Sequence, residues 1–272
     1  MSNILIRRQD GARAQATRTS TIARQWSGDN RAFTLIELLI TIGIIGVLIG
    51  ILSPAIRGAL AAAGRTGSLS NLRQLGITVE AFTQSNKGRY LVTAPGHSYP
   101  VSLNGDMGFG PGNRWQSLYA WPGALAEFAP LRAYFEILFS PGSPKLRKFK
   151  LNAFGPYTSY WYANSFVAQP ALWTPGVTPT ASMLVVTRVD QVEFTANKVL
   201  FWDVERAYDK RWLREHANVD DAPTPMLFAD AHADVKKPAD AADAQPNPLN
   251  SRAGDASMRL SNTLRGVRGR DY

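Results

Sequence analysis

The stretch at residues 31–56 reads RAFTLIELLITIGIIGVLIGILSPAI and contains a long apolar run with one carboxylate near its start. The nineteen residues from Leu38 to Ile56 carry no charge, and Glu37 directly precedes them. A helix needs about 20 such residues to cross the hydrocarbon core of a bilayer, because each residue adds about 1.5 Å. The composition therefore predicts a membrane-spanning helix over 33–56.

Residues 1–32 differ from this run because they are basic and poor in apolar side chains. They contain six arginines against Asp10 and Asp29, and they lack the apolar content needed to build a core. We therefore expect a basic leader peptide over 1–32 that stays on the cytoplasmic side of the membrane. A secretory signal peptide would have a shorter apolar stretch followed by a small-residue cleavage site, whereas this run continues as helix into SPAIRGALAAAGR.

The next segment, 57–88, is predicted to be the exported, amphipathic half of the same helix. Asn86 and Gly88 are stop signals that end it. Pro54 removes one backbone hydrogen bond within the helix and is expected to bend it. Apolar residues recur at three- and four-residue spacing, which places them on one helix face: Leu69, Leu72, Leu75, Val79 and Phe82.

From residue 89 onward the chain becomes rich in Gly, Pro, Trp and Tyr, which predicts a globular domain over 89–236. Strand-like runs occur at 182–189, 198–204 and 225–230, and a short helix or two fits 117–135. The predicted fold class is therefore α+β, with a small antiparallel sheet packed on the exported half of the long helix. Residues 237–272 are rich in Pro, Ala and Asp and then in Arg, and we expect a disordered basic tail there.

The residues RAFTLIELL at 31–39 resemble the N-terminus of type IV prepilins and type II secretion pseudopilins, a pilin-like family. The resemblance implies that a prepilin peptidase cleaves between Ala32 and Phe33 and methylates the Phe33 amine. The family usually has glycine where Ala32 stands. Glu37 becomes the fifth residue of the mature chain, and a carboxylate in hydrocarbon needs a partner. We expect it to pair with the Phe33 amine of a neighbouring subunit, which would set the register of assembly.

Two further features of the apolar run bear on assembly. Gly46 and Gly50 form a small-xxx-small pair, which allows close approach of membrane helices. By the resemblance, the stretch from Gly46 to Pro54 loosens when subunits assemble. Glu37, Gly46 and Pro54 are therefore the candidate assembly residues.

A second resemblance lies at 226–237, MLFADAHADVKK, which is similar to a strand hairpin of some pseudopilin-type proteins, with Ala231 where glycine is usual. A strand there would place three alternating side chains on one face as a weak metal site, with a solvated strand edge as the alternative: Asp230, His232 and Asp234. Asp220 and Asp221 add loop carboxylates of the kind that Ca²⁺ prefers, so Ca²⁺ is the one cofactor that we consider.

The residue types that carry catalysis do not converge in this sequence. It contains no cysteine, and its three histidines lie in unrelated contexts. We therefore expect that the protein is not an enzyme. The formal net charge of +9 lies mainly at the two ends of the sequence, so nucleic acid is not an expected partner.

These observations lead to one expected function and two alternatives. The expected function is a structural subunit of a pseudopilus-type filament in type II protein secretion, assembled through its hydrophobic helix. Its partners would be further copies of itself, minor pseudopilins, a prepilin peptidase, a secretion platform protein with its ATPase, and membrane lipid. It would cross the cytoplasmic membrane once, with the leader inside and the domain in the periplasm. The alternatives are a type IV pilin for adhesion, motility or DNA uptake, and a membrane-anchored binding domain.

Overall fold

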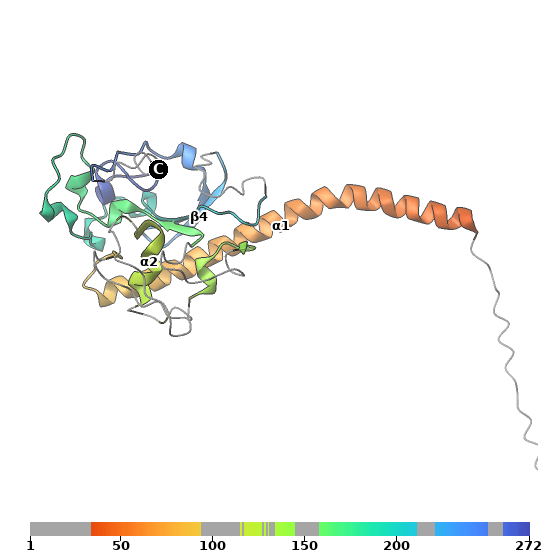
Figure 1. Cartoon of the computed structure of the whole chain (residues 1–272), viewed down its shortest axis with the longest axis horizontal. Helices are drawn as coiled ribbons and strands as arrows, with labels where there is room; N and C mark the ends of the chain where they lie inside the picture. Colours follow the sequence, from red (N-terminus) through yellow and green to blue (C-terminus); the bar gives the residue numbers. More distant parts are fainter. Residues whose placement is uncertain are drawn as a thin grey trace, which may run out of the picture. The chain divides into compact units, whose positions relative to one another are not determined.

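A computed structural model gives the structure of the chain (Figure 1). It describes residues 34–93, 115, 117–126, 128, 130, 134–144, 158–210, 221–249 and 258–272. The chain divides into two compact units, Met1–Ile51 and Leu52–Tyr272. The fold is α+β as predicted, because a long helix that begins in an apolar run packs on a small four-stranded antiparallel sheet within the second unit.

Helix α1 spans Leu35–Ser85 and contributes to both units. Helical backbone continues through Pro54, which lies inside it. The helix ends near the predicted stop signals. Gly88 has a φ of 75°, and its amide donates to the Thr83 carbonyl at 2.8 Å. Glycine adopts this left-handed conformation without a steric cost, and it therefore closes the last turn.

In the second unit, α1 turns its predicted apolar face toward the sheet. At Gly76 an added β-carbon would lie 3.1 Å from Leu227 Cδ1 of the sheet. The missing side chain at Gly76 therefore lets helix and sheet approach closely. The side chains that α1 buries recur with helical spacing: Ala61, Ser68, Leu72, Leu75, Gly76, Val79 and Thr83.

The sheet contains, in spatial order, β1 (Tyr160–Tyr162), β2 (Val199–Asp203), β3 (Thr224–Phe228) and β4 (Ala233–Lys236), all antiparallel. Strands β2 and β3 are buried along their whole length, whereas β4 is partly exposed. The two central strands lie within or next to the predicted runs 198–204 and 225–230. Their side chains, including Phe201 and Leu227, form part of the main core.

The described part of the second unit also contains one short α-helix and several 3-10 helices. Helix α2 (Ser117–Ala126) confirms the helix predicted within 117–135, and its Trp121 donates from Nε1 to the Tyr160 carbonyl at 2.9 Å. The 3-10 helices are η3 (Glu136–Leu138), η4 (Asn164–Phe166), η5 (Pro170–Trp173), η6 (Ala181–Leu184), η7 (Val189–Gln191), η8 (Thr195–Asn197), η9 (Pro238–Asp240) and η10 (Gly266–Arg268).

The strand predicted at 182–189 is wrong. Its first residues belong to η6, and Val185 and Val189 are exposed. The segment meets loop backbone rather than a strand, since Thr187 donates to the Phe166 carbonyl at 3.1 Å and Arg188 forms one isolated bridge with Arg89. Residues with a high propensity for strands do not form one unless a neighbouring strand continues the pattern of hydrogen bonds.

A buried polar cluster joins α1 to the end of β2. Asp203 is fully buried, and its Oδ2 accepts hydrogen bonds from Ser68 Oγ of α1 and from Ser140 Oγ, each at 2.8 Å. The Arg206 amide donates to its Oδ1 at 2.8 Å. Burial raises the pKa of the Asp203 carboxyl, and these hydrogen bonds oppose that shift. Both oxygens therefore have donors, as a polar group in a core requires.

The expectation of a disordered tail at 237–272 is contradicted by the described part of that segment. Met258, Leu260 and Val267 belong to the main core, and Asp271 is buried. The Asp271 carboxylate lies 3.2 Å from the Nζ of Lys198, which is also buried. The composition of this segment predicts disorder wrongly, because Lys198, which pairs with Asp271 and holds the segment in place, lies 73 positions away in the chain.

Asp271→Ala is expected to destabilise the second unit by about 3–5 kcal/mol, because it leaves the Lys198 ammonium buried without its counter-ion. Asp243→Ala removes the exposed partner of Arg259 and is the control, with an expected loss below about 1 kcal/mol. Urea unfolding of the full chain in detergent, followed by tryptophan fluorescence, measures both changes. Equal stabilities of the wild type and Asp271→Ala would contradict the role given to the buried pair.

Candidate functional site

The first turn of α1 holds Glu37 in a reciprocal set of hydrogen bonds with Thr34. The Thr34 amide and hydroxyl each donate to Glu37 Oε2 at 2.9 Å, and the Glu37 amide donates to Thr34 Oγ1 at 3.3 Å. This capping box satisfies amides that the start of a helix otherwise leaves free. This cap was not among the features expected from the sequence, although the Thr-x-x-Glu spacing at 34–37 is visible there. Glu37 therefore has a role within its own helix.

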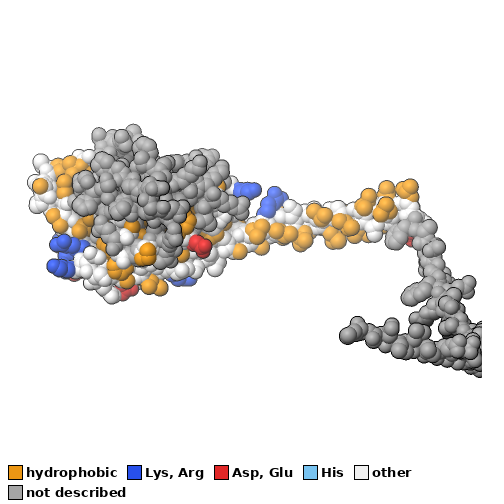
Figure 2. All heavy atoms as spheres, turned by 60° about the horizontal axis from the view of Figure 1, so that its bottom comes forward, with side chains coloured by type: hydrophobic (Ala, Val, Ile, Leu, Met, Phe, Trp, Pro, Cys, Tyr) orange, Lys and Arg blue, Asp and Glu red, His pale blue; other side chains and the backbone are white. Residues whose placement is uncertain are grey.

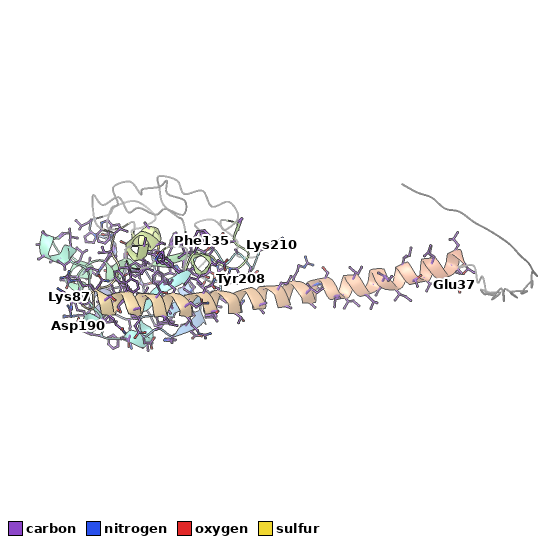
Figure 3. All side chains as sticks on the ribbon, turned by 90° about the horizontal axis from the view of Figure 1, so that it is seen from below. Glu37, Lys87, Phe135, Asp190, Tyr208 and Lys210 are labelled. Atoms are coloured by element: carbon purple, nitrogen blue, oxygen red, sulfur yellow. The ribbon has the colours of Figure 1, made fainter. Side chains whose placement is uncertain are left out.

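The capping box leaves part of the Glu37 carboxylate unused. Its Oε1 accepts no hydrogen bond from any residue that the structure describes, and its side chain is exposed at the start of the apolar segment (Figure 3). The Thr41 hydroxyl, one turn further on, is already satisfied by the Glu37 and Leu38 carbonyls at 2.6 and 2.9 Å. A second molecule would thus meet a free carboxylate oxygen at this turn.

The predicted cleavage site lies outside the described residues, because the description begins at Thr34. Cleavage between Ala32 and Phe33, methylation of Phe33 and pairing of its amine with Glu37 therefore stay predictions.

The segment after Glu37 exposes apolar side chains all around the helix. Every Leu, Ile and Val from Leu35 to Ile56 is exposed, and Figure 2 shows hydrophobic side chains along this helix. An 18-residue window of α1 has a mean hydropathy of 2.7, and none of it is buried. By length and composition, α1 is able to cross a membrane. A surface this apolar is unfavourable in water and calls for a cover of lipid or other helices.

Gly43, Gly46 and Gly50 lie on this uncovered helix. A β-carbon added at any of them meets no atom within 4 Å, so no contact of the described chain requires glycine there. Glycines spaced four residues apart let a second membrane helix approach closely. The role of Gly46 in contacts between helices stays a prediction. The stretch from Gly46 to Pro54 is helical here, and its loosening on assembly stays a prediction.

One comparison with known proteins identifies this same segment. Residues 28–53 match the family described as the prokaryotic N-terminal methylation motif. The chain carries a prepilin-type N-terminal motif. The prepilin-type motif includes Ala32, Phe33 and Glu37 and ends just before Pro54. Its presence is consistent with a pilin-like or pseudopilin-like protein, as the resemblance of residues 31–39 implies. No curated protein and no solved structure matches the chain.

The three weak metal candidates do not form a site in the structure. Asp230 Oδ1 lies 2.5 Å from His232 Nδ1, and Asp234 Oδ1 accepts from the Val235 amide at 2.7 Å. No group of three or more His, Cys, Asp or Glu side chains within the described ranges is arranged to hold a metal ion.

The prediction that these three side chains share one strand face is wrong, because β3 ends at Phe228 and residues 229–232 form a turn. Ala231 adopts a φ of 67° in this turn, where the resembled hairpin usually has glycine. Of the two additional Ca²⁺ candidates, Asp220 lies outside the described residues and Asp221 is exposed.

Thr34→Ala is expected to increase fraying of the first turn of α1, because loss of an N-cap side chain costs about 0.5–2 kcal/mol of helix stability. Amide hydrogen exchange of residues 35–38 in the full chain, held in detergent micelles, measures the effect. Thr34→Ser keeps the hydroxyl and is the matched control. Unchanged exchange in Thr34→Ala would show that the capping box does not stabilise this turn.

Proposed function

We propose that this chain is a structural subunit of a type II secretion pseudopilus, processed by a prepilin peptidase and assembled through α1. The observation that carries the proposal is the prepilin-type motif at residues 28–53, placed at the start of a helix whose Leu, Ile and Val side chains from Leu35 to Ile56 are all exposed. The motif supports a pilin- or pseudopilin-type subunit in general. Such subunits are generally structural rather than enzymatic.

Assembly follows from what the exposed helix requires. In the membrane, lipid covers the apolar side chains from Leu35 to Ile56, and in a fibre the same surfaces of neighbouring copies cover one another. A carboxylate costs at least about 2.5 kcal/mol at the centre of a membrane, so Glu37 needs a partner once it leaves the headgroup region. The Phe33 amine of a neighbour is such a partner. No residue that the structure describes occupies Glu37 Oε1, so this oxygen would receive the amine while Oε2 keeps the helix cap.

Two observations favour the pseudopilus over the type IV pilin. The chain has no cysteine, whereas many such pilins close a loop of their domain with a disulfide. Basic residues near 251–272 would suit a pilin that contacts DNA, but Arg259 is paired with Asp243, and Arg265 and Arg268 lie near Glu193. These arginines therefore have partners within the chain.

The proposed setting follows from the same motif. The chain would cross the cytoplasmic membrane once, with the leader 1–32 inside and the sheet unit in the periplasm. A secretion ATPase and a platform protein would drive assembly, and minor pseudopilins would join the fibre. The competing proposal, a membrane-anchored binding domain, needs no cleavage and no contact between copies.

The mature protein purified from membranes is expected to start at Phe33 and to carry one added methyl group. Ala32→Gly keeps a small residue at the cut and is expected to be processed at least as well as the wild type. Ala32→Arg places a long charged side chain there and is expected to block cleavage. Intact-mass measurement distinguishes these states, and a wild-type mass that retains residues 1–32 would overturn the filament proposal.

Glu37→Ala is expected to leave membrane insertion intact, because removal of a carboxylate favours hydrocarbon, and to prevent incorporation into fibres. Thr34→Ala weakens the helix cap but keeps the carboxylate, so it is the matched control and is expected to assemble. Sedimentation of sheared fibres followed by immunoblotting measures incorporation. Normal assembly of Glu37→Ala would refute the amine pairing, and failure of Thr34→Ala would assign the defect to the helix cap.

A further inference from the structure

Lys198 and Asp271 are buried in contact with each other, and neither the prepilin-type motif nor the proposed assembly uses them. Lys198 lies directly before β2, and Asp271 lies in the C-terminal segment. Among the described residues, Lys198 is the one lysine that is buried. A buried ion pair adds little net stability, because the desolvation of both groups offsets their attraction. The contact therefore holds an amine and a carboxyl group side by side at a high desolvation cost.

The Lys198 amine faces both oxygens of the Asp271 carboxyl group equally. Its Nζ lies 3.2 Å from Oδ1 and 3.2 Å from Oδ2. Equal distances place Nζ on the plane that bisects the carboxyl group, and this plane contains the carboxyl carbon. Two groups that are held together in this way do not need to meet by diffusion, which greatly favours a reaction between them.

Burial favours the uncharged forms of both groups. The Lys198 side chain is fully buried, and its Nζ lies 5.8 Å from the centroid of the Phe166 ring. Desolvation lowers the pKa of Lys198, although the charge of Asp271 opposes this shift. Transfer of one proton within the pair produces an amine and a carboxylic acid and cancels both charges. The uncharged amine is the nucleophilic form of lysine.

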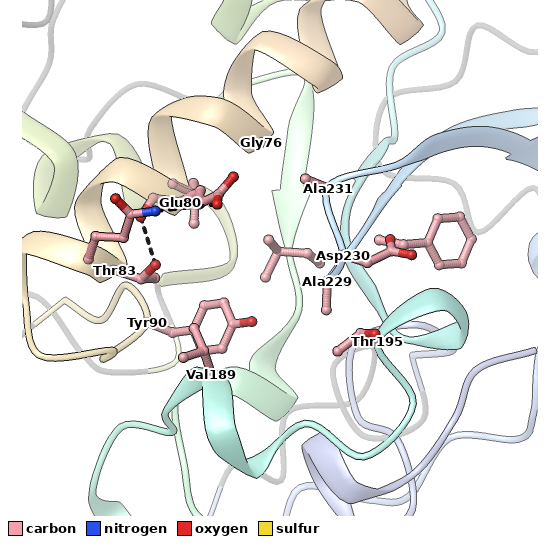
Figure 4. A pocket seen from close by; sticks show the side chains of 13 residues that line it. Gly76, Glu80, Thr83, Tyr90, Val189, Thr195, Ala229, Asp230 and Ala231 are labelled. Carbon is pink, nitrogen blue, oxygen red and sulfur yellow. Dashed lines mark hydrogen bonds between the residues drawn. The ribbon is translucent and has the colours of Figure 1, made fainter.

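The pair is enclosed and is separate from the pocket that lies between α1 and the turn after β3. The Lys198 carbonyl accepts a hydrogen bond from the Ala229 amide at 2.9 Å, and Ala229 lines that pocket (Figure 4). The described residues that line the pocket do not include Lys198 or Asp271. Because the two side chains are only 0% and 2% exposed, bulk water has little access to them.

Two hydrogen-bond donors give the Asp271 oxygens different surroundings. The Val199 amide donates to Oδ2 at 2.8 Å, where it would stabilise negative charge that develops on this oxygen. The Thr263 hydroxyl donates to Oδ1 and accepts a hydrogen bond from Lys198 Nζ. This hydroxyl therefore connects the amine with Oδ1, and it is placed to relay a proton between them.

We propose that Lys198 and Asp271 condense to an intramolecular amide that joins Nζ to Cγ. The uncharged amine attacks Cγ of the protonated carboxyl group, and a C–N bond forms. Thr263 passes a proton from the nitrogen to Oδ1, the bond between Cγ and Oδ1 breaks, and Oδ1 leaves as water. One ammonium and one carboxylate thus give one amide and one water molecule, so the reaction needs no oxidant, reductant or other reactant.

The product fits its surroundings better than the ion pair does. The amide carries no charge, so the desolvation penalty of the two ions disappears. Its carbonyl oxygen, Oδ2, keeps the Val199 amide as a donor, and its N–H keeps Thr263 Oγ1 as an acceptor. The bond closes a covalent loop between positions that lie 73 residues apart. Such a loop restricts the unfolded chain as a disulfide would, in a protein that has no cysteine.

Peptide mapping of the full chain, purified from membranes and digested with trypsin after denaturation, tests this bond. Trypsin does not cleave after a lysine whose amine is acylated. We expect mass spectrometry to find a branched peptide in which 189–206 carries 271–272, lighter than the sum of the two parts by one water molecule. Without the bond, trypsin releases 189–198, 199–206 and 271–272 as separate peptides.

Lys198→Arg keeps the positive charge but replaces the amine by a guanidinium, which does not lose its proton, and we expect no branched peptide. Lys236→Arg is the matched control, because Lys236 Nζ also lies close to the C-terminal segment, 4.4 Å from the centroid of the Tyr272 ring. We expect the bond to form in Lys236→Arg as it does in the wild type.

Thr263→Val removes the relaying hydroxyl and keeps the shape of the side chain. We expect it to slow formation of the branched peptide by about tenfold or more, measured at intervals after a pulse of isotope-labelled synthesis. Thr263→Ser keeps the hydroxyl and is expected to restore the rate. Equal rates in Thr263→Val and the wild type would refute the relay.

Complete release of 189–198 and 271–272 from the wild type would overturn the proposal, and this measurement does not depend on the folding of any variant. A loss of water confined to 271–272 would indicate a cyclic imide of Asp271 and would overturn it as well. The bond lies outside residues 28–53 and requires no fibres. Its absence therefore leaves the proposed secretion function untouched, and a failure of assembly leaves the bond untouched.

Discussion

The apolar surface of α1 from Leu35 to Ile56 must be covered by something other than the described part of the chain. The backbone of this segment satisfies its own hydrogen bonds as a helix, which is the condition for entering hydrocarbon. Its side chains have no partner in the described chain, so lipid or further copies must supply one. A β-carbon added at Gly43, Gly46 or Gly50 would meet no atom within 4 Å, and no described residue donates a hydrogen bond to Glu37 Oε1.

Further along the chain, the same helix satisfies a different requirement. Leu72, Leu75 and Val79 are buried on the sheet side, and Gly76 lets the helix approach Leu227. Ser68 adds a polar contact through Asp203. One helix therefore combines a surface that needs an external cover with a surface that the chain covers itself. Lacking cysteine, the sheet unit relies on packing and on buried polar pairs such as Lys198 with Asp271.

Glu37 links the local and the proposed intermolecular roles of the motif. A helix that starts inside a membrane has free amides that water cannot satisfy, and the Thr34–Glu37 capping box supplies acceptors from the chain itself. The cap uses one carboxylate oxygen, so pairing with an amine through the other does not require the cap to open. A single carboxylate thus stabilises the start of the helix and, in the assembly that we propose, also sets the register between copies.

The sequence alone determined the features that depend on neighbours along the chain. The span of α1, its stop near Gly88, and the two central strands follow from periodicity and turn residues, which act over a few positions. The capping box was equally local and was visible as Thr34 and Glu37. The motif at 28–53 is likewise a short contiguous pattern.

Features that depend on partners far away in the chain became visible only in the folded structure. The segment 182–189 has the composition of a strand but meets no strand to pair with, and β1 is only three residues long. The described part of 237–272 is ordered because Asp271 pairs with Lys198, which lies 73 positions away in the chain. The contact of α1 with β3 at Gly76 and Leu227 joins two elements that no local pattern connects. Burial and charge compensation between remote residues arise only once the chain has folded, and local composition does not record them.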